Sequence, residues 1–305
     1  MSIRRYLSLL ALAVVVLLAT LVWFYPSGAD FISGNRGWNG AREFCNTFGV
    51  DVVHSLDDLP AGPEGALLIA IPYQRYSAGE LAVIERFVAS GGVLLLADDY
   101  GNGNQVLDYL QANAGFSGEQ LVDPLFNYVN SSMPEIVDFE DSGLVDGVQS
   151  IILNHATALT VGDDWQVVAS SSEASFIDLN DNRTADAGEQ AGPLTVAATL
   201  GYGRGSIILL SDPSMIINCM LDLADNYIFM DNILHFDSAE AGIMLDQSHL
   251  SGDGLDEAKG WLGAARDALA APAGVAGIGT IIIALTLYPI WITIRGGKDG
   301  RRKAK

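Results

Sequence analysis

An apolar run without charge lies near each end of this chain. The first covers residues 6–25 and the second 273–294. About 20 such residues are enough to span the hydrocarbon core of a bilayer, so both are predicted to be transmembrane helices. Basic residues lie beyond each run, at residues 1–5 on one side and in the tail 295–305 on the other. The positive-inside bias therefore places both termini in the cytoplasm.

This pattern predicts a two-pass protein of the cell membrane whose central part, residues 26–254, is extracellular. A cleaved signal is the alternative for the first run, because Ser27-Gly28-Ala29 resembles a cleavage site. The run is longer than the usual apolar region of a signal, about 7 to 15 residues. It also ends in Trp23-Phe24-Tyr25, an aromatic belt typical of a membrane interface. An uncleaved anchor is therefore favoured.

The charge of the central part restricts its partners. The chain has 37 acidic and 16 basic residues, and setting aside those that flank the apolar runs leaves 36 against 8. Such a surface repels phosphate backbones, so no nucleic acid partner is expected. The membrane and other membrane or exported proteins fit the predicted location. Residues 255–272 are expected to form an amphipathic helix against the domain or the bilayer surface.

The central part is predicted to be a mixed α/β domain. Strand-like runs at 50–54, 66–71 and 93–97 alternate with helical spacing at 40–48, 77–90 and 105–114. This order favours a mainly parallel sheet with helices on both faces. Further strand-like runs follow at 149–153, 165–170, 175–179, 194–200 and 206–210, and helical spacing returns at 214–236. We expect 206–210 to join the parallel sheet and the strands before it to form a strand-rich insertion.

Several short motifs accompany these elements. They are Ile71-Pro72, Gly91-Gly92, Gly203-Arg204-Gly205, Ser211-Asp212-Pro213-Ser214, Asn218, Asp225-Asn226 and the segment 244–249. Together they resemble an uncharacterised membrane-anchored family of prokaryotes whose outer domain is similar to type 1 glutamine amidotransferases. Gln247 departs from the acid usual in that family. The resemblance implies a flavodoxin-like sheet of the amidotransferase kind.

An amidotransferase of this type needs a nucleophilic cysteine on a tight strand-to-helix turn. The corresponding turn here is 97–101, in which Asp99 takes the place of the nucleophile, and a carboxylate cannot form the thioester. Cys45 and Cys219 lie elsewhere in the sequence. An exported location permits a disulfide between them, and two free thiols are an equally good interpretation. Amidotransferase activity is therefore not expected.

Polar residues follow the predicted parallel strands and are candidates for a ligand site, because ligands of open α/β sheets bind beyond the carboxyl ends of the strands. The alternative is that Asp, Asn and Gly merely form turns. His249 is added as the histidine that lies within one of the motifs. The candidates are Tyr73, Arg75, Asp98, Asp99, Asn102, Asp212, Ser214 and His249.

The loop 178–189 has the oxygen spacing of a calcium loop. Side-chain oxygens fall at positions 1, 3, 5, 9 and 12, and a carbonyl is available at position 7. The residues are Asp178, Asn180, Asn182, Thr184, Asp186 and Glu189. Arg183 replaces the glycine needed at position 6, and the flanking segments resemble strands instead of paired helices. A structural Ca²⁺ is favoured over a turn-rich hairpin that binds nothing.

Two functions of different class remain. The favoured one is a non-catalytic extracellular binding or scaffold module of a membrane complex, because the turn lacks its nucleophile. The alternative is an exported hydrolase that depends on carboxylates or a metal. Close approach of Asp98, Asp99 and Asp212, with a cleft and a histidine beside them, would favour the hydrolase.

Overall fold

The computed structural model describes residues 3–25, 27–236, 242–252 and 254–271, together with 276, 277, 280, 283 and 287. The chain divides into two compact units. One comprises Met1–Tyr25 and Gly252–Lys305, and the other Pro26–Ser251. The predicted second membrane helix, 273–294, lies almost entirely outside the described residues, as does the tail 295–305.

The first unit contains α1 (Ile3–Phe24) and α6 (Gly254–Ala270). Among the described residues, one helical segment is long and apolar enough to cross a membrane, Tyr6–Phe24 of α1. Length and composition alone do not separate a membrane anchor from a signal sequence. α6 corresponds to the helix predicted at 255–272, and its two ends lie within two residues of the predicted ones. Within this unit, the Arg266 guanidinium lies over the ring of Trp23, 5.6 Å from its centroid.

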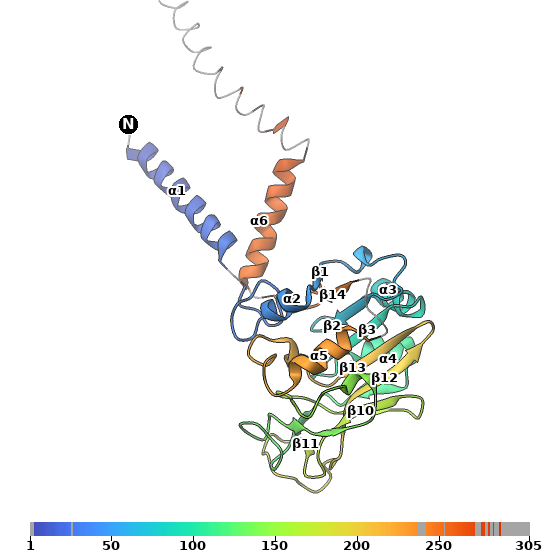
Figure 1. The fold of residues 1–305 in the computed structure, drawn as a ribbon. Helices are drawn as coiled ribbons and strands as arrows, with labels where there is room; N and C mark the ends of the chain where they lie inside the picture. Colours follow the sequence, from blue (N-terminus) through green and yellow to red (C-terminus); the bar gives the residue numbers. More distant parts are fainter. Residues whose placement is uncertain are drawn as a thin grey trace, which may run out of the picture. The chain divides into compact units, whose positions relative to one another are not determined.

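The second unit is a mixed α/β domain with a mainly parallel central sheet (Figure 1). Five strands run parallel in the order β1-β14-β2-β3-β13, and the sheet continues through the antiparallel strands β12, β10 and β7. The parallel strands are β1 (Asp51–Val53), β14 (Ile243–Asp246), β2 (Leu67–Ala70), β3 (Val93–Ala97) and β13 (Gly205–Leu210). The prediction that 206–210 joins the parallel sheet is confirmed.

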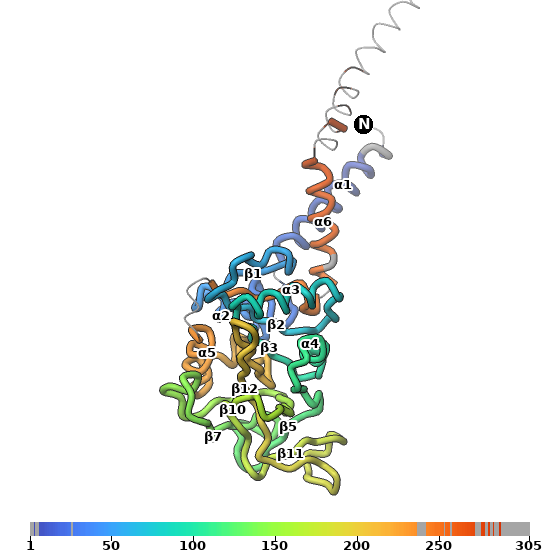
Figure 2. Tube along the Cα trace, turned by 90° about the vertical axis from the view of Figure 1, so that its right-hand side faces the viewer, coloured from blue at the N-terminus to red at the C-terminus, as the bar shows by residue number. Residues whose placement is uncertain are grey.

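Helices cover both faces of this sheet, with α2 and α5 on one side and α3 and α4 on the other (Figure 2). Successive strand residues point to opposite faces, so Leu67 and Ile69 enter the core under α2 and α5. Leu68 and Ala70 enter the core under α3 and α4. The helices are α2 (Arg42–Phe48), α3 (Ala78–Ala89), α4 (Asn104–Leu110) and α5 (Asn226–Leu234).

Local chemistry explains several boundaries. α3 begins at a capping box, in which Ser77 and Glu80 each accept a hydrogen bond from the backbone N–H of the other. α4 ends at Leu110 instead of residue 114, because Gln111 adopts the left-handed conformation (φ 53°). The segment predicted as a helix at 214–236 contains only the 3-10 turn Pro213–Ile216 and α5.

The insertion between β3 and β13 carries the remaining strands. Within it β9 pairs with β4 and β12, β11 pairs with β5, and β8 pairs with β6. These strands are β4 (Ala114–Phe116), β5 (Gln120–Val122), β6 (Glu135–Ile136), β7 (Asp138–Phe139), β8 (Ile151–Ile152), β9 (Leu159–Val161), β10 (Gln166–Ser170), β11 (Phe176–Asp178) and β12 (Thr195–Tyr202). A tight hairpin joins β12 to β13, with Gly203 at φ 60°. Gly205 approaches β3 so closely that a Cβ would lie 2.0 Å from the carbonyl oxygen of Gly92.

Candidate functional site

Loops that follow three adjacent parallel strands meet at the carboxyl edge of the sheet. The ladder pairs Ala70 of β2 with Leu96 of β3, and Ala97 of β3 with Leu210 of β13. The three strands therefore end side by side. Tyr73, Asp99 and Ser214, one from each following loop, line a single cavity of about 160 Å³. We call it the edge cavity.

The remaining walls of the edge cavity come from segments that carried no signal in the sequence. Asp30, Phe31, Trp38 and Asn39 lie in the segment before α2, and Asn154 and His155 follow β8. No periodicity marks these irregular segments, so sequence reasoning missed them. Tyr100 and Ile217 complete the lining.

Aromatic rings form a row along the cavity. The ring centroids of Phe31 and Tyr73 are 5.8 Å apart, and those of Tyr73 and Tyr100 are 6.0 Å apart with the planes at 65°. Phe31 is buried, whereas Trp38 and Tyr100 have exposed fractions of 68% and 64%. The row therefore runs from the interior of the domain to solvent.

Two of the three predicted aspartates hold the backbone in place. Asp98 accepts hydrogen bonds from the N–H groups of Tyr100 and Gly103, at 3.0 and 2.5 Å. Asp212 is fully buried and accepts from the N–H groups of Ser214 and Asn154, at 2.7 and 2.6 Å. Burial nonetheless raises the pKa of Asp212 to about 6. Asp212 thereby connects the loop after β13 to the loop after β8, both of which line the cavity.

Asp99 is the carboxylate that remains available. Within the described residues, no other residue donates a hydrogen bond to its side chain. Burial, followed by the negative charges of Asp212 and Asp98, raises its pKa to about 7. Asp99, together with burial and Asp30, raises the pKa of Tyr100. Asp99 therefore faces the cavity as a partly buried acid in a negative surrounding.

A network of side-chain amides fixes the wall that carries Asp30. Asn35 donates to the carbonyl of Ala29 at 2.8 Å, and Asn39 donates to Asp30. Asn218 donates to the carbonyl of Gly37 at 2.6 Å. Gly40 lies so close to Asn35 that a Cβ would meet its carbonyl oxygen at 2.1 Å. This segment is therefore a rigid wall despite its lack of regular structure.

The motif Asp225-Asn226 has a comparable structural role. Asp225 accepts hydrogen bonds from the N–H groups of Gln149 and Ser150, at 2.8 and 3.2 Å. Asn226 is buried and exchanges hydrogen bonds with both backbone groups of Ile152. These contacts attach β8 to α5 and so position the loop that carries Asn154 and His155.

The other predicted site residues lie outside the edge cavity. Arg75 and Asn102 are exposed on the loops after β2 and β3. His249 is buried beside Asp246 at the end of β14, with its Nδ1 2.8 Å from Oδ2 of Asp246. The converging site therefore includes Tyr73, Asp99 and Ser214 in its lining and Asp98 and Asp212 behind it.

His249 belongs to a second buried network. Oδ2 of Asp246 also accepts from the Tyr76 hydroxyl at 3.1 Å, and Oδ1 accepts from the N–H and hydroxyl of Ser248 at 2.9 and 2.5 Å. Nε2 of His249 lies 3.5 Å from Glu80. Burial opposes the charged form of His249, but Asp246 and Glu80 together raise its pKa. Burial likewise opposes the charge of Asp246, but hydrogen bonds from His249 and Ser248 lower its pKa.

The predicted calcium loop closes on itself through hydrogen bonds. The side-chain amides of Asn180 and Asn182 both donate to Asp186, at 2.9 and 2.7 Å, so loop positions 3, 5 and 9 converge. Arg183 has φ 58°, the left-handed conformation that glycine normally supplies at position 6.

The carboxylates at the two ends of this loop face the backbone. Asp178 accepts from the N–H of Arg183 at 2.7 Å, and Glu189 accepts from those of Leu179 and Asp186, at 3.0 and 2.8 Å. Both would have to turn to bind a cation. Within the part of the chain that is described, no three His, Cys, Asp or Glu residues form a group that could hold a metal ion. The residues thus fit calcium in part, and calcium binding stays a prediction.

We expect calcium at tenfold excess over its Kd to raise the free energy of unfolding by about 1.4 kcal/mol. Thermal unfolding of the full chain in nonionic detergent, with calcium or with chelator, measures this effect. Asp186→Ser should abolish it, and Asp163→Asn in another exposed turn should retain it. Identical unfolding temperatures with and without calcium would contradict the prediction.

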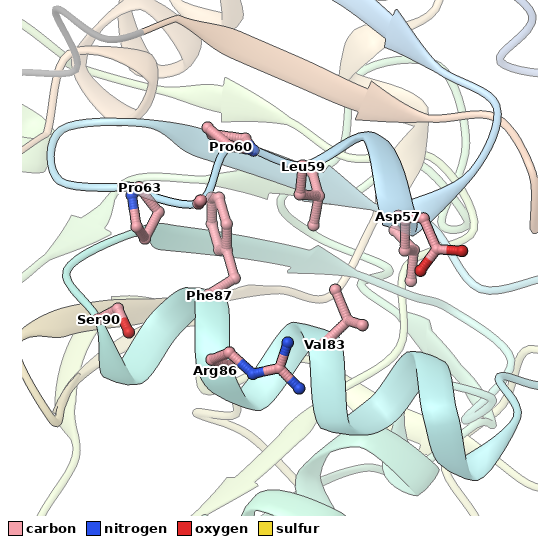
Figure 3. A pocket seen from close by; sticks show the side chains of 10 residues that line it. Asp57, Leu59, Pro60, Pro63, Val83, Arg86, Phe87 and Ser90 are labelled. Carbon is pink, nitrogen blue, oxygen red and sulfur yellow. The ribbon is translucent and has the colours of Figure 1, made fainter.

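A second pocket, of about 190 Å³, lies between α3 and the segment that joins β1 to β2 (Figure 3). Leu59, Pro60 and Pro63 face Val83 and Phe87 of the helix across it. None of the predicted site residues lines this pocket. Asp57, Arg86 and Ser90 also line it, but none of its residues comes from the loops that follow β2, β3 and β13, so we favour the edge cavity as the functional site.

Both cysteines are free thiols, which decides between the two interpretations of the sequence. Cys45 is buried in α2, and burial raises its pKa to about 11. Cys219 is exposed. Neither cysteine lines the edge cavity.

Comparison with solved structures gives remote likenesses. The mmIFT52 N-terminal domain is 16% identical, with 61% of this chain and 81% of that chain covered and a TM-score of 0.47. Cytoplasmic protein STM1381 from Salmonella typhimurium LT2 is 13% identical, with 65% and 80% covered and a TM-score of 0.41.

A β-galactosidase from Bacillus circulans sp. alkalophilus is 16% identical, with 51% of this chain and 21% of that chain covered and a TM-score of 0.34. The chain thus spans about a fifth of the β-galactosidase. At these TM-scores the likenesses support no inference about function. A search among curated proteins found no significant match.

One family matches the sequence over residues 33–234, a range that begins in the wall segment before α2 and ends with α5. It therefore covers all the residues of the edge cavity except Asp30 and Phe31. The chain belongs to this family, which is described as Domain of unknown function (DUF4350).

Proposed function

We propose that this protein is a membrane-anchored, non-catalytic binding module that presents its α/β domain outside the cell. α1 and residues 273–294 would anchor it, with both termini in the cytoplasm and 26–254 outside. The observation that carries the proposal is the edge cavity, where Tyr73, Asp99 and Ser214 converge from three strand ends. Its partners would be other membrane or exported proteins, and the acidic surface disfavours nucleic acid.

The chemistry of the cavity supports binding more than catalysis. We further propose that the domain is related to type 1 glutamine amidotransferases, with Asp99 on the turn after β3 in place of the nucleophile. Asp98 and Asp212 each have both oxygens occupied by backbone N–H groups. These contacts give both carboxylates a structural role, which leaves Asp99 as the one predicted aspartate without it, whereas hydrolysis by a carboxylate pair uses two.

One observation favours a second candidate, an exported hydrolase that depends on carboxylates or a metal. Asp99 has a pKa of about 7, near the optimum for a general acid, and His155 lines the same cavity. This candidate requires a measurable hydrolytic activity that is lost in Asp99→Asn. If the wild type shows no such activity, or if the activity survives in Asp99→Asn, the binding module remains the better proposal.

The outward location is tested with the chain's own thiols. A membrane-impermeant maleimide added to intact cells should modify the protein at the exposed Cys219 and leave the buried Cys45 unmodified. Cys219→Ser should abolish labelling, and Cys45→Ser should preserve it. Labelling that occurs only after the cells are permeabilised would contradict an extracellular domain.

Occupancy of the edge cavity is tested with the same reagent. In a Cys219→Ser background, His155→Cys places a thiol at the exposed rim of the cavity and Tyr109→Cys places one on α4, away from the cavity. A bound ligand should make the thiol at 155 react more slowly in cells than in the purified, washed protein, while the thiol at 109 reacts equally in both. Equal ratios at the two positions would contradict the binding function.

A further inference from the structure

The lining of the edge cavity has an unbalanced charge. It contains the carboxylates of Asp30 and Asp99, and no lysine or arginine occurs among the described residues that line it. Both carboxylates share the lining with Tyr73. Burial, followed by the charges of Asp99 and Asp30 among others, raises the pKa of Tyr73. An anionic ligand would be repelled here, and an apolar ligand would leave Asp99 without a partner.

The aromatic row adds a second attraction for cations. The faces of aromatic rings carry negative charge density and attract ammonium groups that lie over them. Phe31, Tyr73 and Tyr100 follow one another at centroid distances of 5.8 and 6.0 Å, and Trp38 lies at the open end with an exposed fraction of 68%. Aromatic faces combined with carboxylates are the means by which proteins bind alkylammonium groups.

The size of the cavity restricts the ligand further. Its volume of about 160 Å³ is below the roughly 300 to 1,000 Å³ of pockets that enclose drug-sized molecules. A headgroup of a few heavy atoms fits this space, whereas a sugar chain or a folded peptide does not. A divalent metal is a poorer occupant, because among the described residues no three His, Cys, Asp or Glu side chains form a group that could hold one, here or elsewhere.

We propose that the edge cavity binds the ammonium headgroup of a small organic cation, between the carboxylates of Asp30 and Asp99 and the rings of Tyr73 and Tyr100. This inference rests on the binding function proposed for the same cavity and names the chemical class of its ligand. The headgroup can be methylated, as in choline, or primary, as in an alkylamine. The experiment below separates these two sources.

Isothermal titration of the full chain in nonionic detergent tests the inference with three probes. Choline and n-butylammonium carry the two kinds of headgroup, and 3,3-dimethylbutan-1-ol has the shape of choline without its charge. At least one ammonium probe should bind, and at least tenfold more tightly than the neutral alcohol. The tighter of the two ammonium probes identifies the headgroup.

Variants assign the binding to the cavity. Asp99→Asn and Tyr100→Ala should each weaken ammonium binding at least tenfold. Asp51→Asn and Tyr128→Ala change an exposed carboxylate and an exposed ring that do not line the cavity, so binding should be unchanged. Asp99→Asn removes an unpaired acid and is expected to fold, which thermal unfolding verifies.

Two results would overturn the inference and leave the proposed function intact. One is an affinity for the neutral alcohol equal to that for the tighter ammonium probe, which would mean that charge is not recognised. The other is no binding of either ammonium probe while the thiol of His155→Cys remains protected in cells. Absence of both probe binding and protection would overturn the inference and the proposed function together.

Discussion

Replacement of Asp246 by asparagine is expected to lower the free energy of unfolding of the α/β domain by about 3 kcal/mol. The carboxylate is fully buried at the end of β14. It accepts hydrogen bonds from Tyr76 and Ser248 and lies 2.8 Å from the Nδ1 of His249. An asparagine amide would offer a donor where these groups also donate. The variant would leave His249 buried without its closest negative partner.

Urea unfolding of the full chain in nonionic detergent measures this effect through tryptophan fluorescence, to which Trp165, buried in the domain, contributes. Asp51→Asn is the matched control, since Asp51 is exposed on the neighbouring strand β1. The control should change stability by no more than about 0.5 kcal/mol. Equal stability of Asp246→Asn and the wild type would refute a net contribution from this network.

The second large effect is a gain of stability. Asp99→Asn should be more stable than the wild type by about 2 kcal/mol at pH 8, a value discounted for the part of the side chain that water reaches. The pKa of Asp99 is about 7 in the folded domain, above the ordinary value of 3.8. Between these values the folded state binds more protons than the unfolded state, so the free energy of unfolding falls as pH rises.

The same relation predicts the pH at which the variant and the wild type converge. Near pH 4 the side chain of Asp99 is protonated and neutral in the folded state, like asparagine, so the two proteins should unfold at similar temperatures. Thermal unfolding in detergent from pH 4 to pH 8 measures the difference. The raised pKa values of Asp212 and His249 act in the same direction and remain in both proteins. An unchanged difference across this range would show that Asp99 does not titrate as described.

A stabilising change at a residue of the proposed ligand site has a physical explanation. A partly buried acid that accepts no hydrogen bond from another described residue, and that lies near the charges of Asp98 and Asp212, destabilises the folded domain when it is ionised. The loops do not depend on Asp99 for their conformation, because Asp98 and Asp212 accept hydrogen bonds from the backbone N–H groups of these loops. Retention of an ionisable group at such a position is typical of binding and catalytic sites.

Much of the sheet follows from local patterns in the sequence. The runs at 66–71, 93–97 and 206–210 are buried on both faces, and their uninterrupted apolar character distinguishes them as parallel strands. The meeting of Tyr73, Asp99 and Ser214 also follows from sequence, because parallel neighbours end at the same edge. β14 was not predicted, since a run of only four residues carries little periodic signal. It nevertheless pairs with β1 and β2, which lie far away in sequence.

The sequence by itself determined the apolar N-terminal helix, the acidic character of the domain, the order of its main elements and three residues of the candidate site. Only the tertiary structure decided which acid is available. Asp98 and Asp212 accept hydrogen bonds from backbone N–H groups of other residues, and Asp99 accepts none from another residue in the described part of the chain. The direction of an N–H group depends on the path of the folded chain. The irregular wall with Asp30, Phe31 and Trp38 was decided in the same way, because amide contacts such as Asn218 to Gly37 join segments that no local pattern connects.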